Sequence, residues 1–295
     1  MAAPEHRRAT ESASASTGTT RPSIAIVVAF FGRAPLWLPA FLVSCRANRD
    51  VRWMIYTDVE PATRMPPNVD WKYMNVGELS SRASDVLGTN VEIRSSYTKK
   101  ISDLKLSFGL VFADDLRPFD FWAHSDLDIV WGDVRQFVTE DILASYDIVS
   151  SRPGRTSGHF NLYRNTPAIN RTFELIPDYA QAMANPEYLH LDERELTRRL
   201  KARLSHGPSE LAPRVYWSQE LTTNAKYQHA LGDSNAGGLW WRNGKTFGAE
   251  GHELMYVHFH KLKHGMHSID FGYDDAPSAF MISRKGFSAA GQRDD

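Results

Sequence analysis

The stretch Phe119–Asp133, FDFWAHSDLDIVWGD, decides how the fold of this chain is interpreted. Its apolar and aromatic runs beside Gly132 are typical of a buried central strand. Asp126 and Asp128 stand near its end, where an open α/β sheet binds ligands, and carboxylates two residues apart in extended chain lie on one side. They repel each other unless a cation or a proton neutralises them, and Mg²⁺ or Mn²⁺ is the simplest such cation. A polar turn after a strand explains the same triplet, so the rest of the chain must decide.

Strand and helix patterns alternate on both sides of this stretch and predict an α/β fold. Residues 24–32 form an apolar run ending in glycine, residues 36–48 place apolar side chains at helical spacing, and residues 51–58 form a second apolar strand, as in a βαβ unit. Asn243-Gly244 predicts a two-residue hairpin. The other predicted strands are 69–76, 119–131, 147–151, 158–164 and 253–261, and the other predicted helices are 78–87, 103–116, 134–144 and 167–184.

The domain organisation that we expect is one domain between two tails. Residues 1–22 are rich in Ala, Ser and Thr, carry no apolar run, and are expected to be a disordered tail. Residues 23–270 are expected to form the domain, with a nucleotide-binding half at 23–150 and an acceptor-side half at 151–270. Residues 271–295 are expected to be a C-terminal tail.

Composition excludes several classes of protein. The chain has 295 residues and a net charge of -1, which argues against nucleic-acid binding by bulk electrostatics. Its one cysteine, Cys45, excludes an intrachain disulfide and a multi-thiolate metal site. The sequence contains no P-loop, no G-x-G-x-x-G and no G-x-S-x-G motif. No segment approaches the ~18 apolar residues of a membrane span, so a cytoplasmic protein is expected, with peripheral membrane contact left open.

A late segment, Tyr256-Val257-His258-Phe259-His260, places two histidines on one face of a predicted strand. An imidazole that joins two carboxylates shifts metal preference from Mg²⁺ towards Mn²⁺. Lys261 and Lys263 follow, and their ammonium groups suit a diphosphate beside a metal. An exposed basic strand end is the alternative interpretation.

Other charged residues are candidates with two interpretations each. Asp192 and Glu193 suit a catalytic base or acceptor clamp, or else acids at the start of a helix. Asp58, which closes a predicted strand, suits a contact with the ribose or base, or a simple turn. Asp103 and Lys105 suit contacts with a donor, or a helix cap and a solvated lysine.

The order of these features resembles that of GT-A glycosyltransferases. Lys100–Lys105 (KISDLK) is followed by Asp126-Leu127-Asp128, then Gly132-Asp133, then Ser157–Phe160 (SGHF), and finally the His-Lys segment. The resemblance covers about residues 23–263 and is to a group of bacterial GT-A-like enzymes, and more distantly to glycogenin-like and capsular-sugar transferases. The late H-x-x-G-x-x-K of glycogenin-like enzymes is spaced differently here, so the phosphate-binding lysine stays open.

The resemblance implies a fold, a cofactor and a set of site residues. The fold is a GT-A, Rossmann-like mixed sheet flanked by helices. Asp126 would contact the donor ribose and the metal, Asp128 would bind the metal, and His258 would be a further ligand. Lys261 or Lys263 would hold the diphosphate, and Phe30 with Asp58 would border the base. The cofactor would be Mn²⁺ or Mg²⁺, and a UDP-sugar is the first-choice donor.

The function predicted from the sequence is metal-dependent transfer of a sugar from a nucleotide-diphosphate sugar to a hydroxyl of a glycan, lipid-linked saccharide or small natural product. An inverting route needs a base, for which Asp192 and Glu193 are the candidates. The alternatives are a sugar-phosphate nucleotidyltransferase and a non-catalytic carbohydrate-binding relative. The latter predicts that the acids and His258 stay apart in the folded chain.

Overall fold

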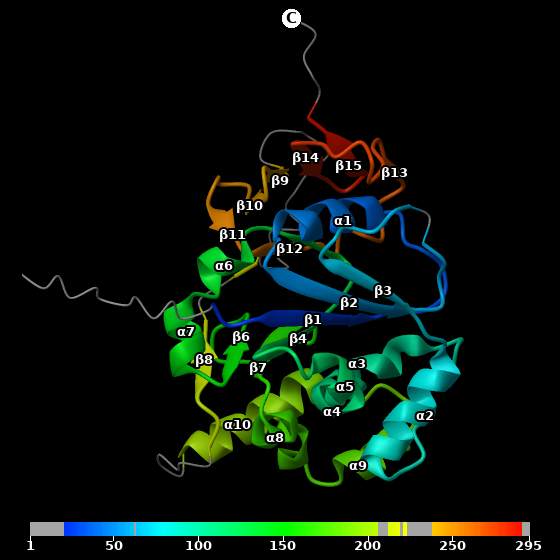
Figure 1. Cartoon of the computed structure of the whole chain (residues 1–295), viewed down its shortest axis with the longest axis vertical. Coiled ribbons are helices and arrows are strands. Elements are labelled where there is room, and N and C mark those ends of the chain that lie inside the picture. The colour runs from blue at the N-terminus through cyan, green and yellow to red at the C-terminus, as the bar shows by residue number, and fades with distance from the viewer. Residues whose placement is uncertain (1–20, 62, 206–211, 219–220, 223–237, 291–295) are drawn as a thin grey trace, which may run out of the picture.

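The computed structural model describes residues 21–61, 63–205, 212–218, 221–222 and 238–290. In that part of the chain, a seven-stranded sheet of order β3-β2-β1-β4-β7-β6-β8 lies at the centre of the molecule (Figure 1). The predicted N-terminal tail lies outside the described residues up to residue 20. The strands of the sheet are β1 (Ile24–Ala29), β2 (Val51–Thr57), β3 (Val69–Tyr73), β4 (Phe121–Ser125), β6 (Ile148–Ser150), β7 (Phe160–Arg164) and β8 (Val215–Trp217).

The sheet is mixed. Strands β3, β2, β1 and β4 run parallel, and Ile24 of β1 stands between Val51 of β2 and Phe121 of β4. Strand β7 is antiparallel to both β4 and β6, whereas β8 is parallel to β6. Helix α1 (Leu38–Ala47) makes the crossover from β1 to β2. A mixed central sheet flanked by helices confirms the α/β fold class that the sequence predicted.

Both faces of the sheet are covered, because β1 buries side chains on both sides. Ile24, Ile26 and Val28 belong to one apolar cluster, which includes α1, and Ala25 and Val27 belong to a second. In Figure 1, α1 lies on one side of the sheet, and α2 (Val76–Leu87), α9 (Tyr179–Met183) and α10 (Leu196–Ser205) lie on the other. Among the described residues, no helix combines the length and apolar character needed to cross a membrane.

Three predicted helices are broken into shorter pieces. The helix expected over 134–144 divides because Thr139 caps a new helix, accepting a hydrogen bond from the Ile142 N–H. The helix expected over 167–184 is interrupted at Pro177 and at Asp178, whose φ is 54°. Residues 101–116 alternate between α and 3₁₀ turns. The short helices of these regions are η1 (Thr98–Lys100), α3 (Ile101–Leu104), η2 (Lys105–Ser107), α4 (Phe108–Val111), α5 (Ala113–Leu116), α6 (Val134–Phe137), α7 (Glu140–Ser145), α8 (Pro167–Asn170) and η3 (Thr172–Leu175). A separate π-helical turn, η4 (Leu191–Glu195), leads into α10.

A second sheet has six strands in the order β11-β10-β9-β14-β15-β13 and lies beyond α1 in Figure 1. Its predicted hairpin is present, with Asn243 and Gly244 both at positive φ, as a tight two-residue turn requires. The prediction of a C-terminal tail over 271–295 is wrong, since β14 and β15 lie within it and their apolar side chains are buried in the core. The strands are β9 (Leu239–Arg242), β10 (Lys245–Phe247), β11 (Glu253–Leu254), β13 (Ser268–Ile269), β14 (Ala279–Ile282) and β15 (Gly286–Ala289).

The single strand expected over 119–131 is two strands in different sheets. β4 ends at Ser125 in the large sheet, and β5 (Ile129–Trp131) pairs with β12 (Tyr256–His258) in a two-stranded sheet. The intervening Asp126-Leu127-Asp128 makes the change of sheet. The acids are therefore held between two short strands rather than at the tail of one.

Candidate functional site

The change of sheet brings the acids and the late histidines together. Strands β5 and β12 are antiparallel, and His258 stands opposite Ile129, the residue after Asp128. The Phe259 N–H donates to the Asp128 carbonyl at 3.2 Å, which extends this pairing beyond the strand ends. Two segments about 130 residues apart in sequence thus share one small ladder, at the carboxyl end of the parallel strand β4.

Asp128 is the centre of the resulting cluster. Its Oδ1 lies 3.4 Å from His258 Nε2, and its Oδ2 lies 3.6 Å from His260 Nδ1. One potential ligand atom from each of the three residues lies within 4.8 Å of the others. Asp126 Oδ2 is 3.9 Å from His258 Nε2. The expectation that Asp128 and His258 meet is confirmed, and His260, for which the sequence predicted only a shared face with His258, joins them.

The electrostatics of the cluster favour an ionised Asp128. Burial by itself would raise the pKa of this carboxyl, whose side chain is only 5% exposed. The charge of His258, the close approach of the His258 and His260 ring nitrogens, and the Lys263 ammonium group outweigh burial and hold the pKa well below its ordinary value. The cluster therefore presents a buried carboxylate anion surrounded by groups that favour its charge.

A lysine amine contacts each of the two acids. Lys263 Nζ lies 2.7 Å from Asp128 Oδ2. Lys105 Nζ makes a short ion pair with Asp126 and also donates to the Gly158 carbonyl at 2.8 Å. Burial would lower the pKa of Lys105, but the nearby carboxylates of Asp126 and Asp192 raise it above its ordinary value. Lys105, for which the sequence suggested a donor contact or a solvated position, is buried against Asp126 and lines a cavity beside the two acids, so the solvated position is wrong and the donor contact stays a prediction.

His258 is held from behind by residues of the SGHF segment. The ring of His159 stacks on the ring of His258, with centroids 4.1 Å apart and planes 23° apart. His159 Nε2 shares a hydrogen bond of 2.8 Å with the Tyr256 hydroxyl. Burial lowers the pKa of His159 well below its ordinary value, so the ring is neutral at pH 7. The buried pair fixes the direction of the His258 ring.

A cavity of about 370 Å³ opens beside these groups. This volume is in the range of small-molecule sites, and its wall combines aromatic and charged side chains, as such sites require. Among the residues that line the cavity, those suited to ligand binding are Phe30, Trp37, Lys105, Asp126, Asp128 and Lys263. Phe30 lines the cavity, with its ring edge-to-face against Trp71 at 6.0 Å, and its contact with a base stays a prediction.

Two predicted nucleotide contacts lie away from this wall. Asp58 accepts a hydrogen bond of 2.8 Å from the Gly32 N–H, which orders the loop after β1, and it does not line the cavity. Gly32 has a φ of 102°, a conformation that favours glycine. Lys261 is exposed and also does not line the cavity, whereas Lys263 does.

The donor-facing position predicted for Asp103 is wrong. Its side chain is fully buried, and both carboxylate oxygens are used by the chain itself. They accept hydrogen bonds from the Leu189 N–H at 2.7 Å, the Leu191 N–H at 2.8 Å and Lys100 Nζ at 3.2 Å. Buried acids normally acquire such partners. Asp103 therefore anchors the segment before Asp192 rather than contacting a ligand.

Asp192 and Glu193 both lie against Gly158. Asp192 is fully buried, and its Oδ1 accepts a hydrogen bond of 3.1 Å from the Tyr188 hydroxyl. Burial raises its pKa to about 7, although nearby Lys105 lowers it. Glu193 is half-buried and accepts a hydrogen bond of 3.0 Å from the Gly158 N–H. Asp192 is therefore too buried to contact an acceptor directly, as the sequence had suggested it could.

Gly158 and His159 are residues that sequence reasoning used only as landmarks. A Cβ at position 158 would overlap the Asp192 carboxylate, so glycine is the residue that fits. Its N–H and carbonyl are bound by Glu193 and Lys105, respectively. The Ser-Gly-His-Phe segment marks this glycine in the sequence. Only the folded chain shows that Gly158 lies between Glu193 on one side and Lys105, the partner of Asp126, on the other.

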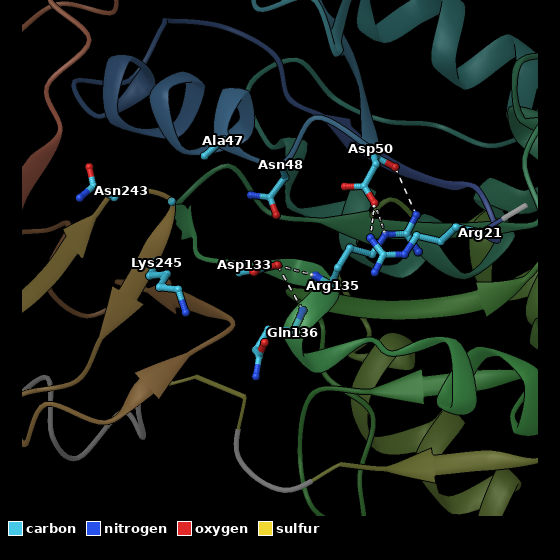
Figure 2. A pocket seen from close by; sticks show the side chains of 10 residues that line it. Arg21, Ala47, Asn48, Asp50, Asp133, Arg135, Gln136, Asn243 and Lys245 are labelled. Carbon is cyan, nitrogen blue, oxygen red and sulfur yellow. Dashed lines mark hydrogen bonds and ion pairs between the residues drawn. The ribbon is translucent and has the colours of Figure 1, made fainter.

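A second polar pocket, of about 300 Å³, lies on another part of the surface (Figure 2). Arg135 and Arg21 both point towards Asp50 in this view, and their ion pairs with its Oδ2 are 2.9 and 3.0 Å long. Asp133 caps α6 by accepting from the Arg135 and Gln136 N–H groups. Arg21, Asp50 and Arg135 thus pair with one another, and no histidine of the first cavity lines this pocket.

Comparison with known proteins assigns the chain to a family. Residues 26–290 match a family described as Family of unknown function (DUF6625). The chain belongs to this family. No curated protein sequence matches this family member.

Solved structures of similar fold include two glycosyltransferases. One is described as mouse xyloside xylosyltransferase 1 in its apo form, with a TM-score of 0.40, 11% identity, and coverage of 80% of this chain and 97% of that chain. The other is the galactosyltransferase LgtC in complex with donor and acceptor sugar analogues, with a TM-score of 0.39, 12% identity, and coverage of 71% of this chain and 78% of that chain. A structure of an active-site mutant of LgtC has the same TM-score and identity.

Proposed function

We propose that this member of the DUF6625 family is a metal-dependent glycosyltransferase of the GT-A type, which moves a sugar from a nucleotide-diphosphate sugar to a hydroxyl acceptor. The observation that carries the proposal is the meeting of Asp128 with His258, at 3.4 Å, beside Asp126 and a cavity with aromatic and cationic walls. A buried carboxylate flanked by two imidazoles beside a cavity is typical of a functional site.

The donor set fits a divalent ion. Asp128 and His258 would hold it, with Asp126 as the ligand nearer to the ribose and His260 as a further imidazole. Carboxylate and imidazole together suit Mn²⁺ better than Mg²⁺, which prefers oxygen ligands alone. Such an ion neutralises the diphosphate that leaves with the nucleoside. The structure satisfies the geometric requirement, since the ligand atoms of Asp128, His258 and His260 lie within 4.8 Å of one another.

The rest of the donor would extend from the acids along the cavity wall. Phe30 is placed to border the base, and a uridine nucleotide is the donor that we test first. Residues 23–150 would supply most donor contacts and residues 151–270 the acceptor side. Asp58 would act through the loop after β1, which its bond to Gly32 orders. Lys263, which lines the cavity, is better placed than Lys261 to meet the diphosphate.

The chain's own acids have separate roles in this proposal. Glu193 is half-buried and its Oε1 touches the Gly158 N–H, so it is the candidate base for an acceptor hydroxyl on an inverting route. Asp192 is buried behind Gly158 and is a candidate for positioning Lys105, which contacts Asp126. Lys105 would thereby keep Asp126 fixed in one direction.

The non-catalytic alternative is less favoured by the geometry. A carbohydrate-binding relative without activity predicts that the acids and His258 stay apart, whereas they converge. A sugar-phosphate nucleotidyltransferase would need a cationic Gly-rich loop after β1. In this chain that loop offers Gly32-Arg33-Ala34-Pro35, of which Arg33 lines the cavity.

Calorimetry with nucleotides tests the proposal. The protein is titrated with UDP, GDP and CDP, each with and without Mn²⁺, and donor hydrolysis is then measured with sugars carried by the nucleotide that binds. We expect one nucleoside diphosphate to bind only when Mn²⁺ is present, with a Kd below about 1 mM, because an ion held by Asp128 and His258 would supply the positive charge that the phosphates need. Absence of metal-dependent binding for all three nucleotides would refute the proposal.

A further inference from the structure

Each of the two acids of the proposed metal site forms an ion pair with a lysine, Asp126 with Lys105 and Asp128 with Lys263. The two lysines differ in how firmly they are held. Lys105 has a side chain only 6% exposed, and its Nζ is bound by the Asp126 carboxylate and the Gly158 carbonyl. Lys263 has a side chain 27% exposed, and its Nζ contacts Asp128 Oδ2 at 2.7 Å. Lys105 is thus built into the protein interior, whereas Lys263 reaches Asp128 from the cavity rim.

The position of Lys263 follows from the turn after β12. Its backbone N–H donates to the Phe259 carbonyl at 3.0 Å, which fixes the stem of the residue while leaving a long, flexible side chain. The same side chain lines the cavity on the side of Asp128 and His260. Because a lysine stem is flexible, the ammonium group can leave the carboxylate by rotation of its side-chain bonds.

Charge makes the present contact of Lys263 with Asp128 unfavourable once a divalent ion is bound by the cluster. An ion held by Asp128, His258 and His260 would share Asp128 with an ammonium group that contacts the same carboxylate. Like charges at such a separation repel strongly in a poorly hydrated site, and the Asp128 side chain is 5% exposed. The cation that can leave is Lys263, because Lys105 is buried against Gly158.

We propose that Lys263 is a displaceable counter-ion of Asp128, which leaves the carboxylate when a divalent ion binds and then pairs with the nucleotide diphosphate. This role of Lys263 rests on the proposed function and adds to it a coupling between metal binding and nucleotide binding. Without nucleotide, the ion must compete with an ammonium group for Asp128. With nucleotide, the displaced ammonium group gains an anionic partner, so metal and nucleotide strengthen each other's binding.

Mn²⁺ affinity tests this role directly, without an activity assay. Binding is followed by the EPR signal of free Mn²⁺, with and without saturating UDP, and free Mn²⁺ is corrected for the Mn²⁺–UDP complex. In the wild type we expect UDP to tighten Mn²⁺ binding about tenfold. In Lys263→Met we expect Mn²⁺ alone to bind about fivefold tighter than in the wild type, and the effect of UDP to fall below about twofold.

The control is a lysine in a carboxylate pair elsewhere. Lys245 Nζ lies 2.9 Å from Glu253 Oε2, outside the proposed site, so Lys245→Met is expected to match the wild type in both Mn²⁺ titrations. Weaker or unchanged Mn²⁺ binding by Lys263→Met would overturn the inference while leaving the proposed function intact. The same holds if Lys261→Met, rather than Lys263→Met, removes the effect of UDP.

Failure of the proposed function has a different signature. If the wild type binds no Mn²⁺, or if Asp128→Ala binds Mn²⁺ as tightly as the wild type, the metal site itself is refuted and the inference falls with it. If Asp128→Ala loses Mn²⁺ binding and only the Lys263 result is contrary, the metal site stands. Circular dichroism of each variant verifies that the fold is retained.

Discussion

The acids of the two polar pockets differ in the chemistry of their partners. Asp50 in the pocket of Figure 2 pairs with Arg135 and Arg21. The Arg135 guanidinium also donates to the carbonyls of Pro22 and Asp50 at 2.9 and 3.2 Å, so several directed bonds hold one arrangement. Asp128 instead faces one flexible lysine and two imidazoles at 3.4 and 3.6 Å.

That difference separates a structural ion pair from an exchangeable one. Guanidinium groups form planar, multidentate contacts that are pre-organised, whereas an ammonium group is a point charge on a flexible stem and a neutral imidazole nitrogen is a metal ligand. Asp50 is 45% exposed and gains little from its charge alone, while Asp128 is 5% exposed and needs a cation. We therefore expect the pocket around Asp50 to matter for stability and the cavity beside Asp128 for ligand binding.

Truncating each acid gives the largest expected contrast. Asp128→Ala removes the central ligand, and Mn²⁺ affinity should fall more than about 100-fold, because loss of even an outer-shell partner costs about 10–100-fold. Asp50→Ala should leave Mn²⁺ affinity within about twofold of the wild type. It should lower the free energy of unfolding by about 1–3 kcal/mol, because Arg135, whose side chain is 7% exposed, loses its partner.

Calorimetric Mn²⁺ titration and urea denaturation of both variants measure this contrast. The matched pair serves as its own control, since each variant loses one carboxylate of the same size. Equal losses of Mn²⁺ affinity in the two variants would erase the distinction between the pockets. Full Mn²⁺ affinity in Asp128→Ala would remove Asp128 from the metal site.

Sequence patterns identified the local elements well where apolar periodicity was strong. The β1, α1, β2 beginning and the Asn243-Gly244 hairpin follow from local rules of burial and turn geometry. The division of 119–131 into β4 and β5 did not, because both halves are apolar and buried and no turn residue other than Asp126-Leu127-Asp128 separates them. Pairing of β5 with β12 is a long-range fact that no local pattern contains.

The candidate site was predictable by residue type more than by position. Asp128 and His258 were paired because their chemistry is complementary, and the structure brings them together. Asp103 was misplaced because an acid at the start of a helix looks the same in sequence whether it faces solvent or anchors a buried segment. Burial of Asp192 likewise depends on Gly158, a residue from a distant strand end.

Asp192 extends the comparison to a buried acid whose side chain accepts a hydrogen bond from the Tyr188 hydroxyl. Its pKa is raised to about 7 by burial, whereas in the unfolded chain it titrates near ~4. The protonated form therefore favours folding below about pH 4, and this contribution is lost as pH rises to about 7. Asp192→Asn does not ionise. Between pH 5 and pH 8 its unfolding free energy should therefore rise by about 2 kcal/mol relative to the wild type.

Urea denaturation at the two pH values tests the prediction for Asp192. Asp115→Asn is the control. Burial would raise the pKa of Asp115, but bonds from Lys72 and Tyr56 lower it, so its stabilising contribution is lost only as pH falls below the ordinary carboxyl range. The difference between Asp115→Asn and the wild type should stay constant from pH 5 to pH 8. A constant difference for Asp192→Asn as well would show that Asp192 is ionised throughout this range.

His260 should give the smallest effect, because it is the most exposed member of the cluster. Its side chain is 49% exposed, against 12% for His258, and its Nδ1 is 3.6 Å from Asp128 Oδ2. We expect His260→Ala to weaken Mn²⁺ binding about fivefold, since one of several ligands is lost, and to narrow the preference for Mn²⁺ over Mg²⁺, because an imidazole favours the former ion.

Parallel titrations with Mn²⁺ and Mg²⁺ measure the ratio of the two affinities. His264→Ala, which removes an exposed histidine whose ring lies 6.1 Å from that of His260, is the matched control. If His260→Ala weakens Mn²⁺ and Mg²⁺ binding equally, His260 acts only through the field around Asp128, and the metal ligands reduce to the two acids and His258.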